Sequence, residues 1–264
     1  MSPKQQANFE QNTLEVSPHE HAEEYNNQGY TLLKGCIDPE HISRLTQSCQ
    51  SILRNQNADV SSIENAHIEH PEIVDRYFPR AHFHERLPFD IQALLSQTML
   101  RSTLKQLSSC SQETDLLGLN PEYSILSWPP ETIQKGFSGY HQDGPSSAVK
   151  HGHPHIWIPI SDSRKLNFKI IPNTHLLGNL PHGMLGQFVK VQHSYVEPLI
   201  QNEEFLQVEV GDALIFSTRA LHCLSLNQTK RICWSLEFIC EVLFTGQSDK
   251  CTKALITKQF HHNP

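Results

Sequence analysis

The chain from Glu122 onward is a succession of short apolar segments separated by turn-forming residues, and this pattern constrains the fold more than any other feature. Short segments rich in β-branched and aromatic residues predict strands. The predicted strands are 122–128, 137–143, 154–161, 167–171, 187–191, 206–209, 213–217, 220–225 and 231–243. Many short strands at such spacing predict a β-sandwich or a barrel.

Helices are predicted mainly before this region. Ser17 is a suitable N-cap for a helix over 18–27, and a short strand over 30–33 follows it. Asp38-Pro39 combines an N-cap with a proline at the first helical position, and apolar residues at helical spacing follow it. Another helix is predicted over 91–108. The expected fold is therefore mainly β with flanking helices.

A length of 264 residues suits one large domain, and no repeat or interdomain linker is visible. We expect a flexible arm over 1–17 and a single domain over 18–264. Within it, helices of 18–110 pack outside a β core that spans 120–245. The segment 57–90 is predicted to be irregular. It is either a cover over a pocket or a packed surface loop.

The composition argues against several classes of partner. The formal charge is −7, whereas a general binder of nucleic acid or of an anionic membrane needs a basic face. No apolar run has the length of a membrane span, and no signal peptide is visible. The seven cysteines are odd in number and include no CxxC. These features predict free thiols and a cytoplasmic protein without a nucleic-acid or membrane partner.

The triplet His141-Gln142-Asp143 is the first candidate for chemistry. If this segment is extended, the imidazole and the carboxylate point the same way, because residues two apart share a face. His222 is the strongest candidate for a third ligand. Two histidines and one carboxylate are typical of non-haem Fe(II) oxygenases. The alternative is a surface turn at Asp143-Gly144-Pro145, since a chain with 17 histidines can contain such a triplet by chance.

Arg231 is a further candidate for the site, because of its expected position beside His222. A hairpin turn predicted at 226–229 would place Arg231 nearly opposite His222, with Cβ atoms about 4.5–5.5 Å apart. A buried guanidinium without an acidic neighbour requires an anion, and its planar fork matches a carboxylate. The alternatives are a core histidine at 222 and an edge-strand cation at 231.

Several sequence blocks occur together in one order. They are Asn27–Leu33, Gly139–Gly144, His155–Ile160, Ile171–His175, Gly211–His222 and Arg231. In this order and spacing, the chain resembles the phytanoyl-CoA dioxygenase family of Fe(II)- and 2-oxoglutarate-dependent oxygenases over roughly residues 22–240. The resemblance implies a double-stranded β-helix, which is a cupin-like jelly roll, with flanking helices.

The resemblance also implies roles for individual residues. His141, Asp143 and His222 match the iron ligands, and Arg231 matches the arginine that holds the distal carboxylate of 2-oxoglutarate. The implied cofactors are Fe(II) and 2-oxoglutarate, with dioxygen as cosubstrate. Because related halogenases replace the carboxylate by a small residue, Asp143 argues against halogenation.

Two further residues, Trp157 and Ser138, match positions that line the cosubstrate pocket. One departure from the family pattern is Pro172–His175, where the usual Pro-Gly-Ser-His is replaced by Pro-Asn-Thr-His. His151, His153 and His155 alternate and could share a face as a second metal site. They are predicted instead to be loop and strand residues without a bound metal.

The predicted activity is hydroxylation, or another oxidation such as desaturation or ring closure, of a small-molecule metabolite. It is coupled to decarboxylation of 2-oxoglutarate to succinate. Two other classes remain open, namely a cupin-like metal enzyme that does not use 2-oxoglutarate and a non-catalytic jelly-roll binding module. The sequence does not identify the substrate, the oxidised position or the oligomeric state.

Overall fold

The structure of the chain is a computed structural model. It describes residues 16–58, 63–77, 93–94, 96–107, 117–119, 126–127, 139–143, 154–161, 166–185, 188–226 and 234–242. Among these residues, no helix is both long enough and apolar enough to span a lipid bilayer.

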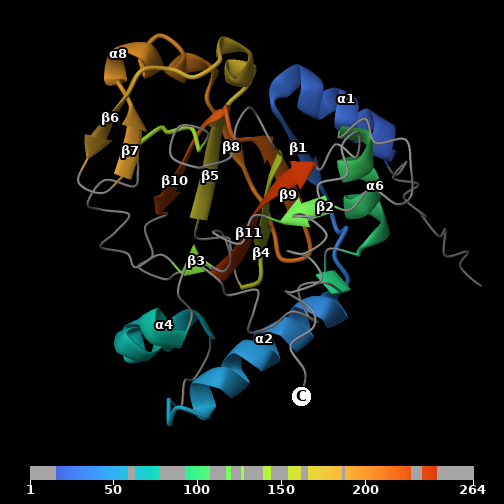
Figure 1. Cartoon of the computed structure of the whole chain (residues 1–264), viewed down its shortest axis with the longest axis vertical. Helices are drawn as coiled ribbons and strands as arrows, with labels where there is room; N and C mark the ends of the chain where they lie inside the picture. Colours follow the sequence, from blue (N-terminus) through green and yellow to red (C-terminus); the bar gives the residue numbers. More distant parts are fainter. Residues whose placement is uncertain are drawn as a thin grey trace, which may run out of the picture.

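Two antiparallel sheets form the centre of the molecule (Figure 1). In spatial order, the main sheet contains β1 (Tyr30–Leu33), β9 (Ala213–Ser217), β4 (Pro154–Pro159), β11 (Trp234–Val242) and β2 (Leu117–Leu119), and β3 (Leu126–Ser127) also pairs with β11. The second sheet contains β10 (Leu221–Leu226), β5 (Leu166–Ile171) and β8 (Glu204–Leu206). A separate hairpin pairs β6 (His182–Leu185) with β7 (Phe188–Val191).

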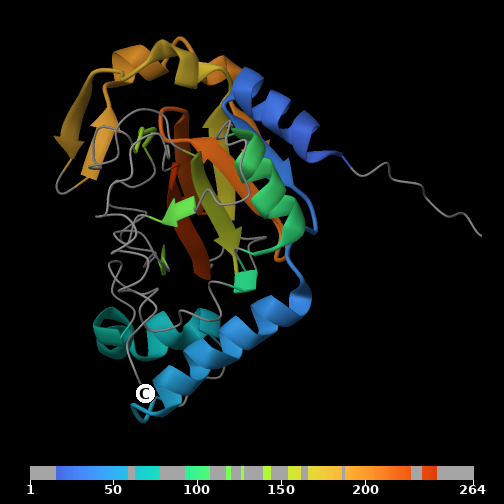
Figure 2. The ribbon, with the colours of Figure 1, turned by 45° about the vertical axis from the view of Figure 1, so that its right-hand side comes forward.

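Helices surround this core. They are α1 (Pro18–Gln28), α2 (Pro39–Arg54), η1 (Ile63–Asn65), α3 (Ala66–Glu69), α4 (Pro71–Tyr77), α6 (Thr98–Leu107), η4 (Thr174–Leu177), α8 (His193–Val196) and η5 (Ile200–Asn202). Figures 1 and 2 show α1 and α6 side by side next to β1, whereas α2 and α4 lie together at the lower end of the molecule.

The first helices form where the sequence supplies caps. Ser17 accepts a hydrogen bond from the backbone N–H of Glu20, whose side chain accepts one from the N–H of Ser17. Gly29 ends α1 with a φ of 88°, which glycine adopts without steric cost. Asp38 caps α2 through the N–H of Glu40. The buried stripe of α2, Ile42, Leu45, Cys49 and Leu53, then anchors the helix to the sheet.

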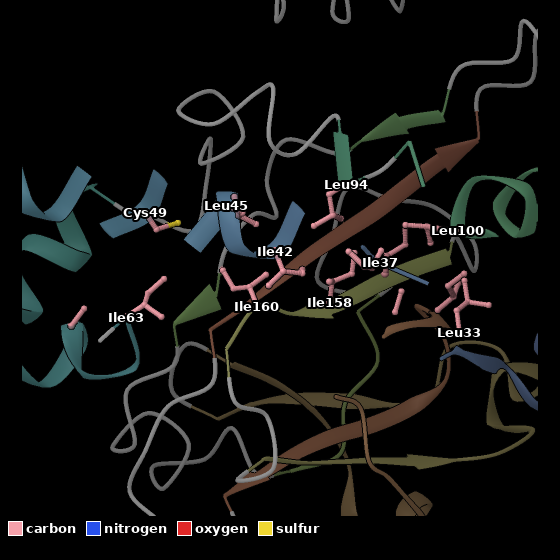
Figure 3. Packing of buried hydrophobic residues seen from close by; sticks show 14 of the residues in the cluster. Leu33, Ile37, Ile42, Leu45, Cys49, Ile63, Leu94, Leu100, Ile158 and Ile160 are labelled. Carbon is pink, nitrogen blue, oxygen red and sulfur yellow. The ribbon is translucent and has the colours of Figure 1, made fainter. Parts of the chain in front are cut away.

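The alternation of side chains along each strand separates two cores. On β4 and β9, Ile156, Ile158, Ala213 and Ile215 join the cluster that faces the helices. Figure 3 shows part of this cluster between α2 and the main sheet. The intervening residues, among them Trp157, face the second sheet. Burial on both faces explains why these strands read as nearly continuous apolar runs.

A second core therefore lies between the two sheets. It contains Trp157, Leu214 and Phe216 of the main sheet together with Phe168, Ile170 and Leu224 of the second sheet. Two antiparallel sheets that share a buried core form a β-sandwich, and a jelly roll is one type of β-sandwich. The expected mainly β fold with flanking helices is confirmed.

Most predicted elements are present, but several boundaries differ. The segment 57–90 is not irregular throughout, because η1, α3 and α4 lie within it, and Pro71 stands at the first position of α4. The helix expected over 91–108 corresponds to α6, which begins at Thr98 after a turn at Ser96. The predicted strand over 206–209 is β8, three residues long and ending at Leu206. Residues 1–15 of the expected arm lie outside the described part.

One predicted pairing is wrong. The turn at 226–229 was expected to close a hairpin between the strands on either side. In the structure, β10 pairs with β5 in the second sheet, whereas β11 pairs with β4 in the main sheet. The chain crosses from one sheet to the other, so that both strands can bury their inner faces in the same core.

Candidate metal centre

His141 and His222 are joined through their backbones. The N–H of His141 donates to the carbonyl of His222 at 3.0 Å, and the N–H of His222 donates to the carbonyl of His141 at 3.2 Å. This bridge places the two side chains on the same side of the chain pair, with ring centroids 4.2 Å apart. His222 therefore reaches His141 although 80 residues separate them in the sequence.

Asp143 completes a three-residue cluster. Its Oδ1 lies 3.6 Å from Nε2 of His141, and its Oδ2 lies 3.5 Å from Nε2 of His222. The backbone N–H of Asp143 donates to the carbonyl of Thr218 in the turn between β9 and β10. One ligand atom from each of the three side chains lies within 4.8 Å of the others, which is close enough for all three to hold one metal ion.

Hydrogen bonds to backbone carbonyls orient both imidazoles. Nδ1 of His141 lies 3.2 Å from the carbonyl of Gly139, and Nδ1 of His222 lies 3.0 Å from the carbonyl of Ala220. Because a carbonyl oxygen only accepts, each Nδ1 carries the proton and donates. The lone pair of each ring is then on Nε2, the atom that faces Asp143. This is the tautomer that leaves Nε2 able to bind a metal.

The protonation states of Asp143 and His222 favour the binding of a cation. Burial raises the pKa of Asp143, but the imidazoles of His222, His155 and His141 and the hydrogen bond from His155 outweigh it. The pKa of this carboxyl therefore lies well below its usual range, and it is ionised. Burial lowers the pKa of His222, against the attraction of Asp143, so this imidazole is neutral near pH 7. One anionic oxygen ligand together with two imidazole ligands favours a divalent metal such as Fe(II).

Aromatic rings from the core between the sheets pack against the cluster. Phe168 stacks on His222 with an interplanar angle of 2° and centroids 5.6 Å apart. Phe216 lies 4.6 Å from the ring of His222 on another side. Both phenylalanines are 2% exposed. They fix the orientation of the imidazole and keep water from this side of the cluster.

Gln142, between the two ligands in sequence, points in the opposite direction. Its Nε2 donates to the carbonyls of Gly178 and Arg219, and its Oε1 accepts from the N–H of Leu180. The side chain is fully buried. It ties the segment that carries His141 and Asp143 to two loops, and sequence reasoning assigned it no role.

Trp157 lies where the alternation of β4 predicts, in the core between the sheets, 5.5 Å from the ring of Phe168. It is 1% exposed, and among the described residues its indole N–H has no hydrogen-bond partner. A buried donor without an acceptor is costly and indicates a partner outside the described residues. Ser138 and Arg231 lie outside the described residues.

His155 is a strand residue of β4, as expected, and it also has a contact that the sequence did not predict. Its Nδ1 lies 2.7 Å from Oδ2 of Asp143. The available signal was its position two residues before Trp157, which places both side chains on the same face of β4. His151 and His153 lie outside the described part. His175 has a structural role, because it packs on Gly29 and bonds the carbonyl of Asn26 at the end of α1.

Comparison with solved structures supports the fold. The chain is similar to EvdO2 from Micromonospora carbonacea var. aurantiaca in complex with 2-oxoglutarate, at 16% identity and a TM-score of 0.56, over 84% of this chain and 91% of that chain. It is also similar to SnoK, a non-haem α-ketoglutarate-dependent carbocyclase from nogalamycin biosynthesis, at 14% identity and a TM-score of 0.52, over 85% and 86% of the two chains. A third similar structure is the apo form of ThoJ, a non-haem monooxygenase, at 16% identity and a TM-score of 0.52, over 83% and 76%.

No curated protein sequence matches the chain significantly. A family profile does match it. The profile of phytanoyl-CoA dioxygenase (PhyH) covers residues 25–232, which include the His-Asp-His cluster and both sheets except β11. The chain therefore belongs to the phytanoyl-CoA dioxygenase family and is a non-haem iron, 2-oxoglutarate-dependent oxygenase.

Proposed function

We propose that His141, Asp143 and His222 hold Fe(II) and that the enzyme hydroxylates, or otherwise oxidises, a small-molecule metabolite. The observation that carries this assignment is the tautomer of the two histidines. Backbone carbonyls bind both Nδ1–H groups, which leaves two Nε2 lone pairs and one ionised carboxylate directed at a common point. This donor set fits iron and leaves positions for further ligands.

The bound iron and 2-oxoglutarate supply the oxidation of a substrate C–H bond by dioxygen, with release of succinate and carbon dioxide. The residues of the chain orient the reactants and exclude water. His141, Asp143 and His222 provide the charge and geometry of the site, and Phe168 and Phe216 close one side of it. Asp143 enters the site already ionised, so metal binding there need not displace a proton from it near pH 7.

We assign the cosubstrate to the side of the site next to Trp157. The indole N–H has no acceptor among the described residues and suits a carboxylate oxygen of 2-oxoglutarate, and Phe168 connects Trp157 to His222 in the same core. Ser138 precedes His141 by three residues and is proposed to line the same pocket. Arg231 is proposed to bind the distal carboxylate, because its position in the chain matches the family arginine.

A free metabolite suits this protein better than a CoA thioester. A thioester of coenzyme A carries several negative charges, whereas the chain has a formal charge of −7. The similar carbocyclase SnoK is from nogalamycin biosynthesis, which supports a natural-product-like substrate. Cys36, Cys49 and Cys223 are free thiols among the described residues, and this supports a reducing, cytoplasmic location.

The proposal is tested by adding 2-oxoglutarate to the protein loaded with Fe(II) without oxygen. We expect a visible metal-to-ligand charge-transfer band that saturates at one equivalent and disappears with a chelator. A protein that binds the metal but shows no band would not use 2-oxoglutarate, and the proposal would be wrong. Candidate metabolites are then screened for stimulated succinate release, which identifies the substrate class.

Arg231→Met is expected to raise the dissociation constant of 2-oxoglutarate by about 10- to 100-fold. The reason is that hydrogen bonds to a charged partner contribute about 1.5–3 kcal/mol. The constant is measured by titration of the charge-transfer band. Arg101→Met, at an exposed position on α6, is the matched control and should leave it unchanged. Equal constants for the two variants would remove Arg231 from the cosubstrate site.

Trp157→Phe is expected to weaken 2-oxoglutarate binding by about 10-fold, because it removes one donor to a carboxylate while the aromatic packing is kept. The stability of the ligand-free protein should change little through the lost N–H, since no described residue accepts its hydrogen bond. Isothermal titration with 2-oxoglutarate measures the affinity, and thermal unfolding of the ligand-free protein measures the stability. An unchanged affinity for 2-oxoglutarate would place the cosubstrate elsewhere.

A further inference from the structure

We propose that His155 is a positioning residue for the metal centre, where its Nδ1–H holds the carboxylate of Asp143 in the orientation that binds the ion. This inference rests on the proposed function, since it assigns Asp143 as a metal ligand. The contact that carries it is the 2.7 Å distance between Nδ1 of His155 and Oδ2 of Asp143. An ionised carboxylate only accepts, so the imidazole donates.

The strand β4 delivers His155 to this place. β4 lies between β9 and β11 in the main sheet, and His155 is opposite Phe216 of β9 in the register. Ile156 faces the helices, whereas His155 and Trp157 face the core between the sheets. A histidine that is 3% exposed at the centre of a sheet has little freedom to move. The hydrogen bond to Asp143 therefore starts from a rigid donor.

The ring of His155 is also held from the side. Phe216 stacks on it with centroids 4.6 Å apart and an interplanar angle of 26°. The same phenylalanine contacts His222, with centroids 4.6 Å apart. One aromatic side chain thus sets the relative position of a metal ligand and of the residue that orients another ligand. An ion pair between His155 and Asp143 alone would not require a contact that also fixes His222.

His155 supports the metal ligands without being one of them. It is not in the group of described side chains whose ligand atoms lie within 4.8 Å of one another. Its hydrogen bond is made to Oδ2 of Asp143, which also lies 3.5 Å from Nε2 of His222, while Oδ1 faces Nε2 of His141. Without this bond the carboxylate of Asp143 could rotate about χ2, an angle whose distribution in aspartates is broad and roughly two-fold. Ordering the carboxylate before the ion arrives raises the affinity for the metal.

The test compares two substitutions of nearly equal shape. In His155→Asn the amide nitrogen occupies about the place of Nδ1 and can donate to Asp143, whereas His155→Leu has the same branching but no donor. The probe is cobalt(II), titrated into the full-length metal-free protein without oxygen and without 2-oxoglutarate. Its visible absorption reports both the dissociation constant and the ligand geometry. Thermal unfolding of the metal-free variants is measured in parallel.

We expect His155→Leu to raise the cobalt dissociation constant by about 10- to 100-fold and to change the visible spectrum, which is the usual cost of losing such an outer partner. His155→Asn is expected to stay within a few-fold of the wild type and to keep the spectrum. If the Leu variant does not fold, His155→Phe takes its place, because it keeps a ring against Phe216 and lacks the N–H.

The outcomes separate the inference from the proposed function. If the wild-type protein binds no cobalt, both fail. If the wild-type protein and the Leu variant bind cobalt equally with the same spectrum, the positioning role is wrong and the metal site stands. A lower stability of both metal-free variants with unchanged cobalt affinity would show that His155 only stabilises the fold, and this too overturns the inference.

Discussion

Asp143→Ala is expected to lower substrate-dependent succinate formation by more than about 100-fold, beyond the 10- to 100-fold cost of losing an outer-shell partner of a metal. The change removes the only anionic ligand from the group formed with His141 and His222 among the described residues. It also leaves the buried Nδ1–H of His155 without this acceptor. Succinate is measured by mass spectrometry with the iron-loaded enzyme and a substrate from the metabolite screen.

The control is Glu197→Ala, which removes an exposed carboxylate whose nearest ion partner is His193. This variant should turn over like the wild type. Asp143→Asn keeps the shape of the side chain and reduces its charge, so it shows whether a loss of activity comes from the ligand or from the fold. If Asp143→Ala turns over normally, the assignment of the three ligands is wrong.

Gln142→Met is expected to lower the free energy of unfolding of the metal-free protein by about 3 kcal/mol. Methionine has nearly the same length, but it cannot replace the bonds from Gln142 to the carbonyls of Gly178 and Arg219 or from the N–H of Leu180. Each buried group left without its partner costs about 1–3 kcal/mol. Partial access of water to these loops reduces the total for the three groups. Urea unfolding followed by circular dichroism measures the loss.

Gln106→Met, at an exposed position on α6, is the matched control and should change the stability by less than about 0.5 kcal/mol. We also expect Gln142→Met to weaken metal binding, because the amide ties the segment between His141 and Asp143 to the loops around it. A variant as stable as the control would show that the three hydrogen bonds contribute little.

Much of the local structure can be read from the sequence. Ser17 and Asp38 cap helices where their side chains predict, and the strands β4, β5, β9 and β10 lie within one residue or so of their predicted starts. The HxD spacing predicts that His141 and Asp143 face one point, and their ligand atoms lie 3.6 Å apart, although described residues 139–143 form only an isolated bridge at His141 and not a strand. These features depend on neighbours in sequence, that is on caps and on the two-residue period of a strand.

The pairing of the strands depends on the whole fold. The turn after β10 reads as a hairpin, yet β10 and β11 belong to different sheets. A two-residue period tells which side chains share a face, but not which strand lies beside it. Which strands pair is decided by the burial of the inner faces of both sheets in one core. This core contains Phe168, Phe216 and Leu224, which come from distant parts of the chain.

The sequence by itself determined the helix caps, the alternation of the strands and the chemistry of the HxD pair, because each of these is set by residues close together in the chain. Only the tertiary structure decided that His155 donates a hydrogen bond to Asp143 and that Gln142 bonds to two loops. It also decided that β10 and β11 belong to different sheets. Contacts between distant segments follow from packing the two sheets around a shared core, which no local pattern encodes.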